Sequence, residues 1–335
     1  MTTTTEGGAA PAKARHGVNL HVLGPILALI ALVIVGALMN SNFLSAGNVT
    51  NVLARSAFIG IIAVGMTFVI TAGGLDLSVG SMAAFIAGLM ILVMNLALPS
   101  MGVGLPVMLL GIATALVAGL VAGWINGILI TTMRIEAFIV TLGTMGIYRS
   151  LVTWLADGGT LSLDFGLRTA LQPLYYSGIL GISWPIIVFA IVAIIGEVVM
   201  RMTAFGRYCA AIGSNDQVAR YSSVNVNRMR LYTYVGLGLL VGIATIMYVP
   251  RLGSASSATG VLWELEAIAA VIIGGTVLKG GFGRVWGTVI GVLILSLIGN
   301  ILNLTDAVSP YLNGAIQGVI IVLAVILQRE SKAGD

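Results

Sequence analysis

Charged residues, cysteine and histidine are all scarce in this chain of 335 residues. Charged residues make up 8% of it, whereas a soluble domain carries about 25%. Because so few charges cannot cover a protein of this size in water, a soluble enzyme is excluded. The single cysteine, Cys209, excludes an intramolecular disulfide and a cysteine-based metal site. With only His16 and His21 as histidines, no metal site is expected.

Phosphate-binding and catalytic motifs are also missing. The stretch from Gly274 to Lys279 has a lysine, but it lacks the spacing and the hydroxyl residue of a GxxxxGK[ST] loop. The apolar runs contain no serine–histidine–aspartate or paired-carboxylate set. The chain is therefore not expected to be an enzyme, and any energy for uphill transport must come from another subunit.

Apolar residues are abundant instead and make up 58% of the chain. A helix that crosses a bilayer needs about 20 of them in succession. The composition therefore predicts an all-α fold, a polytopic transmembrane helical bundle. The apolar runs predict about ten spans, at 20–39, 50–72, 78–98, 105–130, 137–156, 183–200, 231–249, 264–279, 285–304 and 311–327.

The basic residues predict the orientation of these spans. With the N-terminus in the cytoplasm and an even number of spans, only Arg168 and Arg251 lie outside, while Arg55 and Arg149 fall within spans. Both termini are therefore expected in the cytoplasm. Loop charges of this kind also explain the net charge of +4, so no nucleic-acid partner is expected. The basic residues assigned to the cytoplasmic side are Lys13, Arg15, Arg134, Arg201, Arg207, Arg220, Arg228, Arg230, Lys279, Arg284, Arg329 and Lys332.

Paired glycines interrupt two of the apolar runs. The first pair, Gly73 and Gly74, precedes Asp76 and Ser78, and the second pair is Gly274 and Gly275. Helices broken within a membrane are tolerated mainly where they line a cavity, so both breaks are candidates for re-entrant segments. Asp76 and Ser78 are expected to cap the helix that follows, or else Asp76 faces a polar pathway.

Four polar residues within or directly between the apolar runs are candidates for a translocation path: Asp76, Asn126, Arg149 and Glu266. An arginine inside a span needs a partner, and either Asp76 or Glu266 is expected to supply it for Arg149. Each candidate also has a simpler interpretation. Glu266 is solvated if it lies at the outer interface, and Asn126, like Asn300, is suited to a hydrogen bond between helices.

Two further patterns concern packing. Glycines recur every four residues at Gly119, Gly123 and Gly127, and again at Gly283, Gly287 and Gly291. Small residues at this spacing let helix backbones approach closely. Glu197 and Arg201 lie one helical turn apart at the end of a span, which predicts a surface ion pair.

Four stretches, in this order, resemble the permease subunits of bacterial ABC importers for monosaccharides, of the ribose, xylose and galactofuranose type. They are GMTFVITAGGLDLSVGS (65–81), FIVTLGTMGIYRS (138–150), FGRYCAAIGSNDQVARYSSVNVNRMR (205–230) and ELEAIAAVIIGGTVLKGGFGRVWGTVIGVLI (264–294). The resemblance runs from about residue 20 to residue 328. It implies a permease domain over 20–328, between cytoplasmic tails at 1–19 and 329–335.

The resemblance also implies that the polar loop 201–230 couples the permease to an ATPase. In this family the loop forms a short cytoplasmic helix that sits in a cleft of the ATPase subunit. This chain departs from the family pattern at Val218, Ser223 and Val224, where alanine, glycine and isoleucine are usual. Asp216 and Arg220 are expected to be exposed there. The positions that match the pattern are Gly206, Arg207, Ala211, Ile212, Gly213, Asn215, Ala219 and Ser222.

The partners and location implied by the resemblance complete the prediction. They are ABC ATPase subunits, a periplasmic sugar-binding protein, a second permease subunit that is identical or related, and membrane lipid, all at the bacterial inner membrane. The chain itself needs no cofactor, because ATP is used by the ATPase. Two alternatives stay open: a related ABC permease for branched-chain amino acids or nucleosides, and an ion-coupled secondary transporter.

Overall fold

The computed structural model describes residues 20–305, 312, 314–316, 318–319 and 322. Helices make up most of this part of the chain, and its strands are only two or three residues long. The prediction of an all-α polytopic bundle is therefore confirmed for the described residues. The predicted tails, 1–19 and 329–335, and most of the tenth predicted span, 311–327, lie outside them.

The elements follow one another along the chain as α1 (Leu20–Met39), α2 (Ala46–Thr71), α3 (Val79–Met101), α4 (Leu105–Thr131), α5 (Ala137–Leu155), β1 (Thr160–Ser162), α6 (Phe165–Leu171), α7 (Pro173–Tyr176), β2 (Gly178–Ile179), β3 (Ile182–Ser183), α8 (Trp184–Met202), α9 (Ala204–Ser214), α10 (Asp216–Tyr221), α11 (Val226–Leu252), β4 (Ser254–Ser256), α12 (Trp263–Ile273) and α13 (Val285–Thr305).

Seven of the described helices are long and apolar enough to cross a membrane: α2, α3, α4, α5, α8, α11 and α13. Within α1, the segment Gly24–Met39 is a shorter apolar helix. The eighth predicted span, 264–279, differs from the expectation, because α12 has 11 residues. A helix of that length extends about 16 Å, half of the roughly 30 Å apolar layer of a bilayer. The count of about ten spans therefore stays a prediction.

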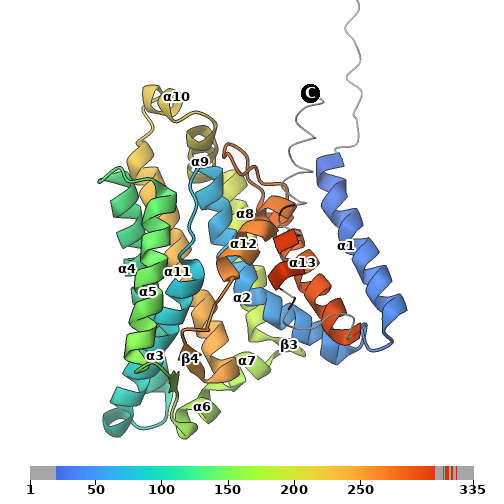
Figure 1. The fold of residues 1–335 in the computed structure, drawn as a ribbon, viewed down its shortest axis with the longest axis vertical. Helices are drawn as coiled ribbons and strands as arrows, with labels where there is room; N and C mark the ends of the chain where they lie inside the picture. Colours follow the sequence, from blue (N-terminus) through green and yellow to red (C-terminus); the bar gives the residue numbers. More distant parts are fainter. Residues whose placement is uncertain (1–19, 306–311, 313, 317, 320–321, 323–335) are drawn as a thin grey trace, which may run out of the picture.

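Helix α2 forms the centre of the bundle. It packs against α8, α11, α12 and α13, and every residue from Ser56 to Thr71 is buried. A helix that is apolar on all sides, as α2 is over this stretch, is stable only when it is covered all round. Figure 1 shows α4 and α5 on one side of this core and α13 with α1 on the other.

Glycine contacts hold α4 against α11. A β-carbon at Gly119 would overlap the carbonyl oxygen of Gly238, and a β-carbon at Gly238 would overlap that of Gly119. Gly123 meets the backbone of Tyr234 in the same way. The close packing predicted from the four-residue glycine spacing is therefore confirmed for α4, and this contact fixes the position of α11 beside α3 and α2.

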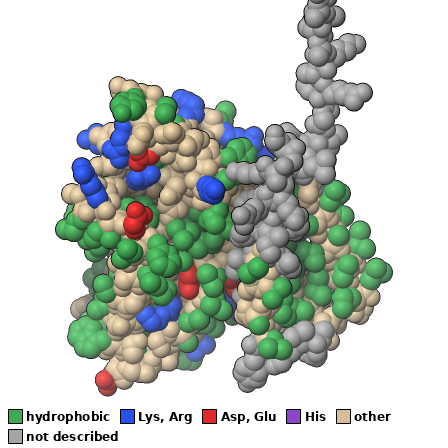
Figure 2. Space-filling model, turned by 45° about the horizontal axis from the view of Figure 1, so that its top comes forward, with side chains coloured by type: hydrophobic (Ala, Val, Ile, Leu, Met, Phe, Trp, Pro, Cys, Tyr) green, Lys and Arg blue, Asp and Glu red, His purple; other side chains and the backbone are tan. Residues whose placement is uncertain are grey.

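The two ends of the bundle differ. One end carries α9 and α10, and the opposite end carries α6, α7 and the short strands (Figure 1). There β1 pairs antiparallel with β4, with Leu161 opposite Ala255, and β2 pairs with β3. Figure 2 shows lysine and arginine side chains gathered near the α9–α10 end, with broad areas of hydrophobic side chains below it.

Candidate coupling and translocation site

The loop that was expected to hold one short helix contains two, α9 and α10. Asn215 separates them with an extended backbone, φ −161°, and its side-chain oxygen accepts a hydrogen bond from the Val218 amide at 3.1 Å. Asn215 is thus the N-cap of α10, a position at which asparagine is preferred. Ala219 is buried with Ile212 and Val226, so this small apolar cluster joins α10 to α9 and α11.

Gly213 lies in the last turn of α9 and touches both broken segments of the bundle. A β-carbon at Gly213 would overlap the carbonyl oxygen of Thr71 and the amide nitrogen of Gly281. Thr71 is the last residue of α2, and Gly281 follows α12. A side chain at residue 213 therefore has no room, because the atoms it would meet are backbone atoms that cannot rotate away.

Two further glycines, Gly73 and Gly280, pack closely at the contact around Gly213. A β-carbon at Gly280 would come within 2.9 Å of Gly213 Cα and 3.0 Å of Gly73 Cα. The Gly281 amide donates a hydrogen bond of 3.0 Å to the Thr71 carbonyl oxygen. We call Gly73, Gly213 and Gly280 the glycine junction. Gly73 and Gly280 both have positive φ, 76° and 87°, which favours glycine.

Both predicted breaks are thus present, and they meet. Helix α2 ends at Thr71, just before Gly73 and Gly74, and α12 ends at Ile273, just before Gly274 and Gly275. Gly274 lies against the backbone of Gly287 in α13. The sequence indicated the two breaks separately, but it contained no signal that they contact each other and the predicted coupling loop at one point.

The remaining predicted coupling residues lie in α9, in α10 and directly after α10. Gly206 is buried, and a β-carbon there would overlap the carbonyl oxygen of Met200, while Arg207 and Ala211 are exposed on α9. Ser222 donates a hydrogen bond to the Val218 carbonyl oxygen at 3.0 Å. Asp216 lies 3.4 Å from Arg220 and 3.3 Å from Arg230, so one carboxylate serves two guanidinium groups.

Asp76 is fully buried in the nonhelical segment between α2 and α3. Its Oδ1 accepts hydrogen bonds from the Ser78 amide at 2.8 Å and the Ser78 hydroxyl at 2.6 Å. Its Oδ2 accepts one from Asn126 Nδ2 at 3.1 Å, and Asn126 also donates to Ser78 Oγ at 2.9 Å. Because its acceptors are occupied by this chain's own donors, Asp76 fixes the segment that leads into α3.

Arg149 does not pair with Asp76 or Glu266, so the predicted partner is wrong. Its Nη1 donates to the carbonyl oxygens of Ser257 and Thr259, at 2.7 and 2.5 Å. These two residues lie in the nonhelical segment between β4 and α12. Backbone carbonyl oxygens can accept the hydrogen bonds of a guanidinium, and a sequence does not reveal which carbonyls will be nearby. Arg149 therefore holds the approach to α12 in place.

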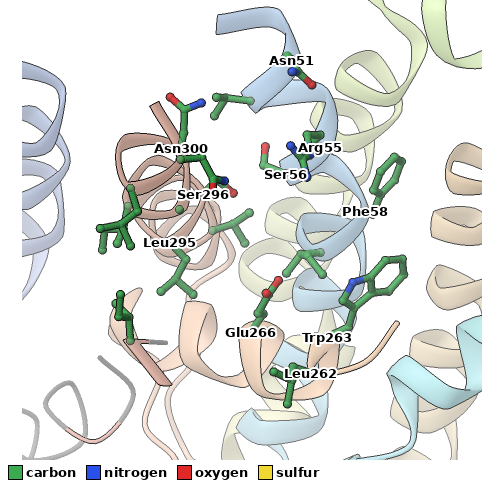
Figure 3. A pocket seen from close by; sticks show the side chains of 18 of the residues that line it. Asn51, Arg55, Ser56, Phe58, Leu262, Trp263, Glu266, Leu295, Ser296 and Asn300 are labelled. Carbon is green, nitrogen blue, oxygen red and sulfur yellow. The ribbon is translucent and has the colours of Figure 1, made fainter. Parts of the chain in front are cut away.

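A cavity of about 580 Å³ lies between α2, α12 and α13. Figure 3 shows Arg55 and Ser56 from α2, Glu266 from α12, and Ser296 and Asn300 from α13 around it. Asn51 and Arg251 also line it, next to apolar walls that include Phe58 and Trp263. A mixed wall of amides, hydroxyls, opposite charges and aromatic rings suits a polar, uncharged solute.

The structure therefore separates the four predicted path residues. Glu266 lines the cavity between α2, α12 and α13, whereas Asp76 and Asn126 form one buried cluster and Arg149 lies at another segment. Arg55, Asn51 and Ser296 were not among the predicted path residues, although they line this cavity. A signal for them was available, because Asn48, Asn51 and Arg55 recur at helical spacing in α2 and Ser296 and Asn300 do so in α13. Asn48 and Asn300 exchange hydrogen bonds at 2.9 and 3.0 Å, as expected for Asn300.

The predicted ion pair between Glu197 and Arg201 is present. It is not a surface pair, because Glu197 is buried and only 8% exposed. Glu197 Oε2 accepts a hydrogen bond of 3.2 Å from the Trp286 amide in the first turn of α13. A carboxylate at a helix N-terminus satisfies amides that have no partner in the helix. Glu197 therefore anchors α13 to α8 close to the second break.

The chain matches one family model, described as the permease component of a branched-chain amino acid transport system, over residues 48–325. It is 36% identical to the ribose import permease protein RbsC of Haemophilus influenzae, over 90% of each chain, and 40% identical to RbsC of Bacillus subtilis, over 94% of each. It is 32% identical to the xylose transport system permease protein XylH of Escherichia coli, over 99% of this chain and 97% of the relative. No solved structure matches the chain. The relatives confirm the resemblance predicted from the four sequence motifs.

Proposed function

We propose that this chain, which belongs to the family described as the permease component of branched-chain amino acid transport systems, is the membrane-spanning permease subunit of an ABC importer for a monosaccharide. The observation that carries the choice of sugar is the similarity to ribose and xylose permeases along at least 90% of this chain. The lining of the cavity beside Glu266 agrees with it, because amides, hydroxyls and charged groups can exchange hydrogen bonds with sugar hydroxyls.

In this proposal α9 and α10 dock onto an ATPase subunit, which binds and hydrolyses the ATP. The permease carries no cofactor and performs no chemistry on the sugar. Because Gly213 touches the ends of both broken segments, a displacement of α9 would be transmitted directly to α2 and to the 274–284 segment. Close-packed contacts of this kind transmit a shift instead of absorbing it.

The sugar path in this proposal runs through the cavity beside Arg55 and Glu266. Asp76, Asn126 and Arg149 support it by fixing the nonhelical segments before α3 and α12. The cavity should bind the sugar weakly, since a deep energy minimum within the path would slow its release. Binding specificity then belongs mainly to a soluble partner that delivers the sugar.

The orientation and partners follow from the same proposal. The basic α9–α10 end faces the cytoplasm of a bacterium, both termini lie on that side, and about ten spans cross the inner membrane. The opposite end, with α6 and α7, receives a periplasmic sugar-binding protein. A second permease subunit, identical or related, completes the path, and lipid covers the remaining apolar faces.

Reconstitution tests this function. The permease, its ATPase and its binding protein are placed in proteoliposomes, and uptake of labelled ribose and xylose is measured with and without ATP inside. We expect uptake that requires all three proteins and ATP. Sugar uptake of equal rate without the ATPase, driven by a proton or sodium gradient, would contradict the proposal and favour a secondary transporter.

The family description supplies one specific alternative, a permease for branched-chain amino acids. Competition separates the two substrates in the same proteoliposomes. Excess unlabelled ribose or xylose should suppress uptake of the labelled sugar, while excess leucine should leave it unchanged. If the proteoliposomes take up labelled leucine and sugars do not suppress this uptake, the substrate is an amino acid and the proposal of a sugar is wrong.

A further inference from the structure

A second cavity, of about 600 Å³, lies at the α9–α10 end and is distinct from the one beside Glu266. Its walls carry the guanidinium groups of Arg134, Arg220 and Arg230. Gly73 and Gly74 also line it, together with Tyr234, whose hydroxyl donates a hydrogen bond of 3.1 Å to the Leu75 carbonyl oxygen. The cavity therefore extends from the loop after α4 to the first helix break.

The positive charge of this cavity is only partly balanced. Asp216 is shared by Arg220 and Arg230, at 3.4 and 3.3 Å, which is long for an arginine–carboxylate contact. Among the described residues Arg134 makes no side-chain hydrogen bond or ion pair, and the one carboxylate that lines the cavity, that of Glu136, is not within ion-pair distance of it. Three arginines thus face two carboxylates.

The backbone of Arg134 is unusual and supports a role for its side chain. Helix α4 ends in a turn in which the Ile135 amide donates to the Leu129 carbonyl oxygen, and Arg134 between them has φ 57°. This left-handed position at a helix end is normally filled by glycine, because any β-carbon is strained there. The arginine at this position places a guanidinium group beside the cavity, although its backbone is strained.

We propose that this cavity binds a phosphate group, held by Arg134, Arg220 and Arg230. The planar guanidinium matches two phosphate oxygens at once, and a cluster of arginines between helices on the basic side of a membrane protein suits an anionic headgroup or a soluble phosphate ester. The Asn227 side chain, which also lines the cavity, adds amide groups. The bound phosphate links the loop after α4 to α10 and α11, next to Gly73 and Gly74, and stabilises that arrangement of the break.

The test measures the apparent melting temperature of the purified permease in two settings. In nanodiscs of neutral phosphatidylcholine, inorganic phosphate or a soluble phosphate monoester is added. In a second set, phosphatidylglycerol replaces part of the lipid. The test variant is Arg134→Gln, which removes the charge of a side chain that makes no hydrogen bond or ion pair with any described residue. The matched control is Arg228→Gln, a change of equal charge at the same end, outside the cavity.

We expect a concentration-dependent rise in melting temperature with at least one phosphate source, and a midpoint shifted about tenfold by Arg134→Gln but not by Arg228→Gln. Stabilisation by soluble phosphate in neutral lipid identifies a free phosphate as the source, and stabilisation by phosphatidylglycerol alone identifies a lipid headgroup. No stabilisation in either setting, or equal loss in both variants, overturns the proposal. Neither setting involves sugar uptake, so this result is independent of the proposed transport function.

Discussion

The two ends of α2 are built for different tasks. At Thr71 the helix meets Gly213 and Gly281 with no space for a methyl group. At the other end, from Asn48 to Ile59, it borders a cavity of about 580 Å³ with polar walls. A tight contact transmits displacement, whereas a wide polar cavity accommodates a solute. One continuous helix of 26 residues joins them, so a movement imposed at the first end can reshape the second.

The largest effect is expected at the tight end. In Gly213→Leu the new side chain would overlap the Thr71 carbonyl and the Gly281 amide. Overpacking against backbone atoms destabilises the packed arrangement by about 3 kcal/mol. This free energy changes the equilibrium population of that arrangement about 100-fold. ATP-driven sugar uptake in proteoliposomes should therefore fall about 100-fold, and Gly213→Ala should give a partial loss.

Gly146→Leu is the matched control, because Gly146 is exposed in α5 with nothing near its β-position. Its uptake should resemble that of the unchanged protein. Size-exclusion chromatography checks that each variant is recovered intact. Normal sugar uptake by intact Gly213→Leu protein would show that the tight contact at Gly213 is not needed for transport.

The next effect concerns the buried support of the first break. In Asp76→Asn one oxygen becomes an amide that faces the Asn126 amide, so a buried donor loses its acceptor. This costs about 1–3 kcal/mol. The melting temperature in detergent should fall, and uptake should fall with it. Asp157→Asn changes an exposed residue whose side chain makes no hydrogen bond or ion pair within the described part of the chain, and it should leave both unchanged. Equal melting temperatures for the two variants would show that Asp76 does not support the break.

At the wide end, loss of a polar wall group should weaken sugar handling without harming the fold. Arg55→Gln and Glu266→Gln each remove one charge from the cavity. We expect the KM for uptake to rise about tenfold, the value of one hydrogen bond to a charged group. Arg168→Gln changes an exposed arginine at the same end of the molecule but outside the cavity, and it should leave the KM unchanged. An unchanged KM in both cavity variants would place the path elsewhere.

The smallest effect is a gain in stability. Ser223, one of the positions at which the chain departs from the family pattern described above, has φ 63° after α10. Ser223→Gly relieves this strain, which exceeds the entropy cost of glycine by at most about 1 kcal/mol. The melting temperature should rise slightly and uptake should persist. Ser222→Gly is the comparison: Ser222 has φ −84°, so glycine there should lower the melting temperature. A lower melting temperature in both variants would mean that backbone strain at Ser223 is negligible.

The long helices were predictable from the sequence because each contains a long apolar run with its own local signal. The first nine predicted runs each contain one helix, and the pairs at Gly73 and Gly274 mark two helix ends. The main error in length was α12, whose apolar run continues past Ile273 into a nonhelical segment. Hydropathy does not distinguish a half-length helix followed by buried loop from a complete span.

The contacts between distant segments were not predictable in this way. The partner of Arg149 is a pair of backbone carbonyls more than 100 residues away, and the glycine junction joins residues 73, 213 and 280. Both depend on how helices pack, which side-chain type alone does not encode. The family resemblance identified the loop 201–230 as a unit, but it did not reveal that Gly213 lies against both breaks.

The central claim is that α9 and the two breaks move as one body. Spin labels at Tyr208 in α9 and Phe282 in the second broken segment, both exposed, report on that body, and a label at Asn300 reports on the cavity. Burial raises the pKa of the Cys209 thiol to about 12, so labelling at neutral pH spares it. Distances are measured in spin-diluted permease–ATPase complexes with and without ATP. If α9 and the breaks move together, ATP leaves the distance between residues 208 and 282 unchanged and alters the distance between residues 208 and 300. An increase in the distance between residues 208 and 282 upon ATP binding would show that they move separately.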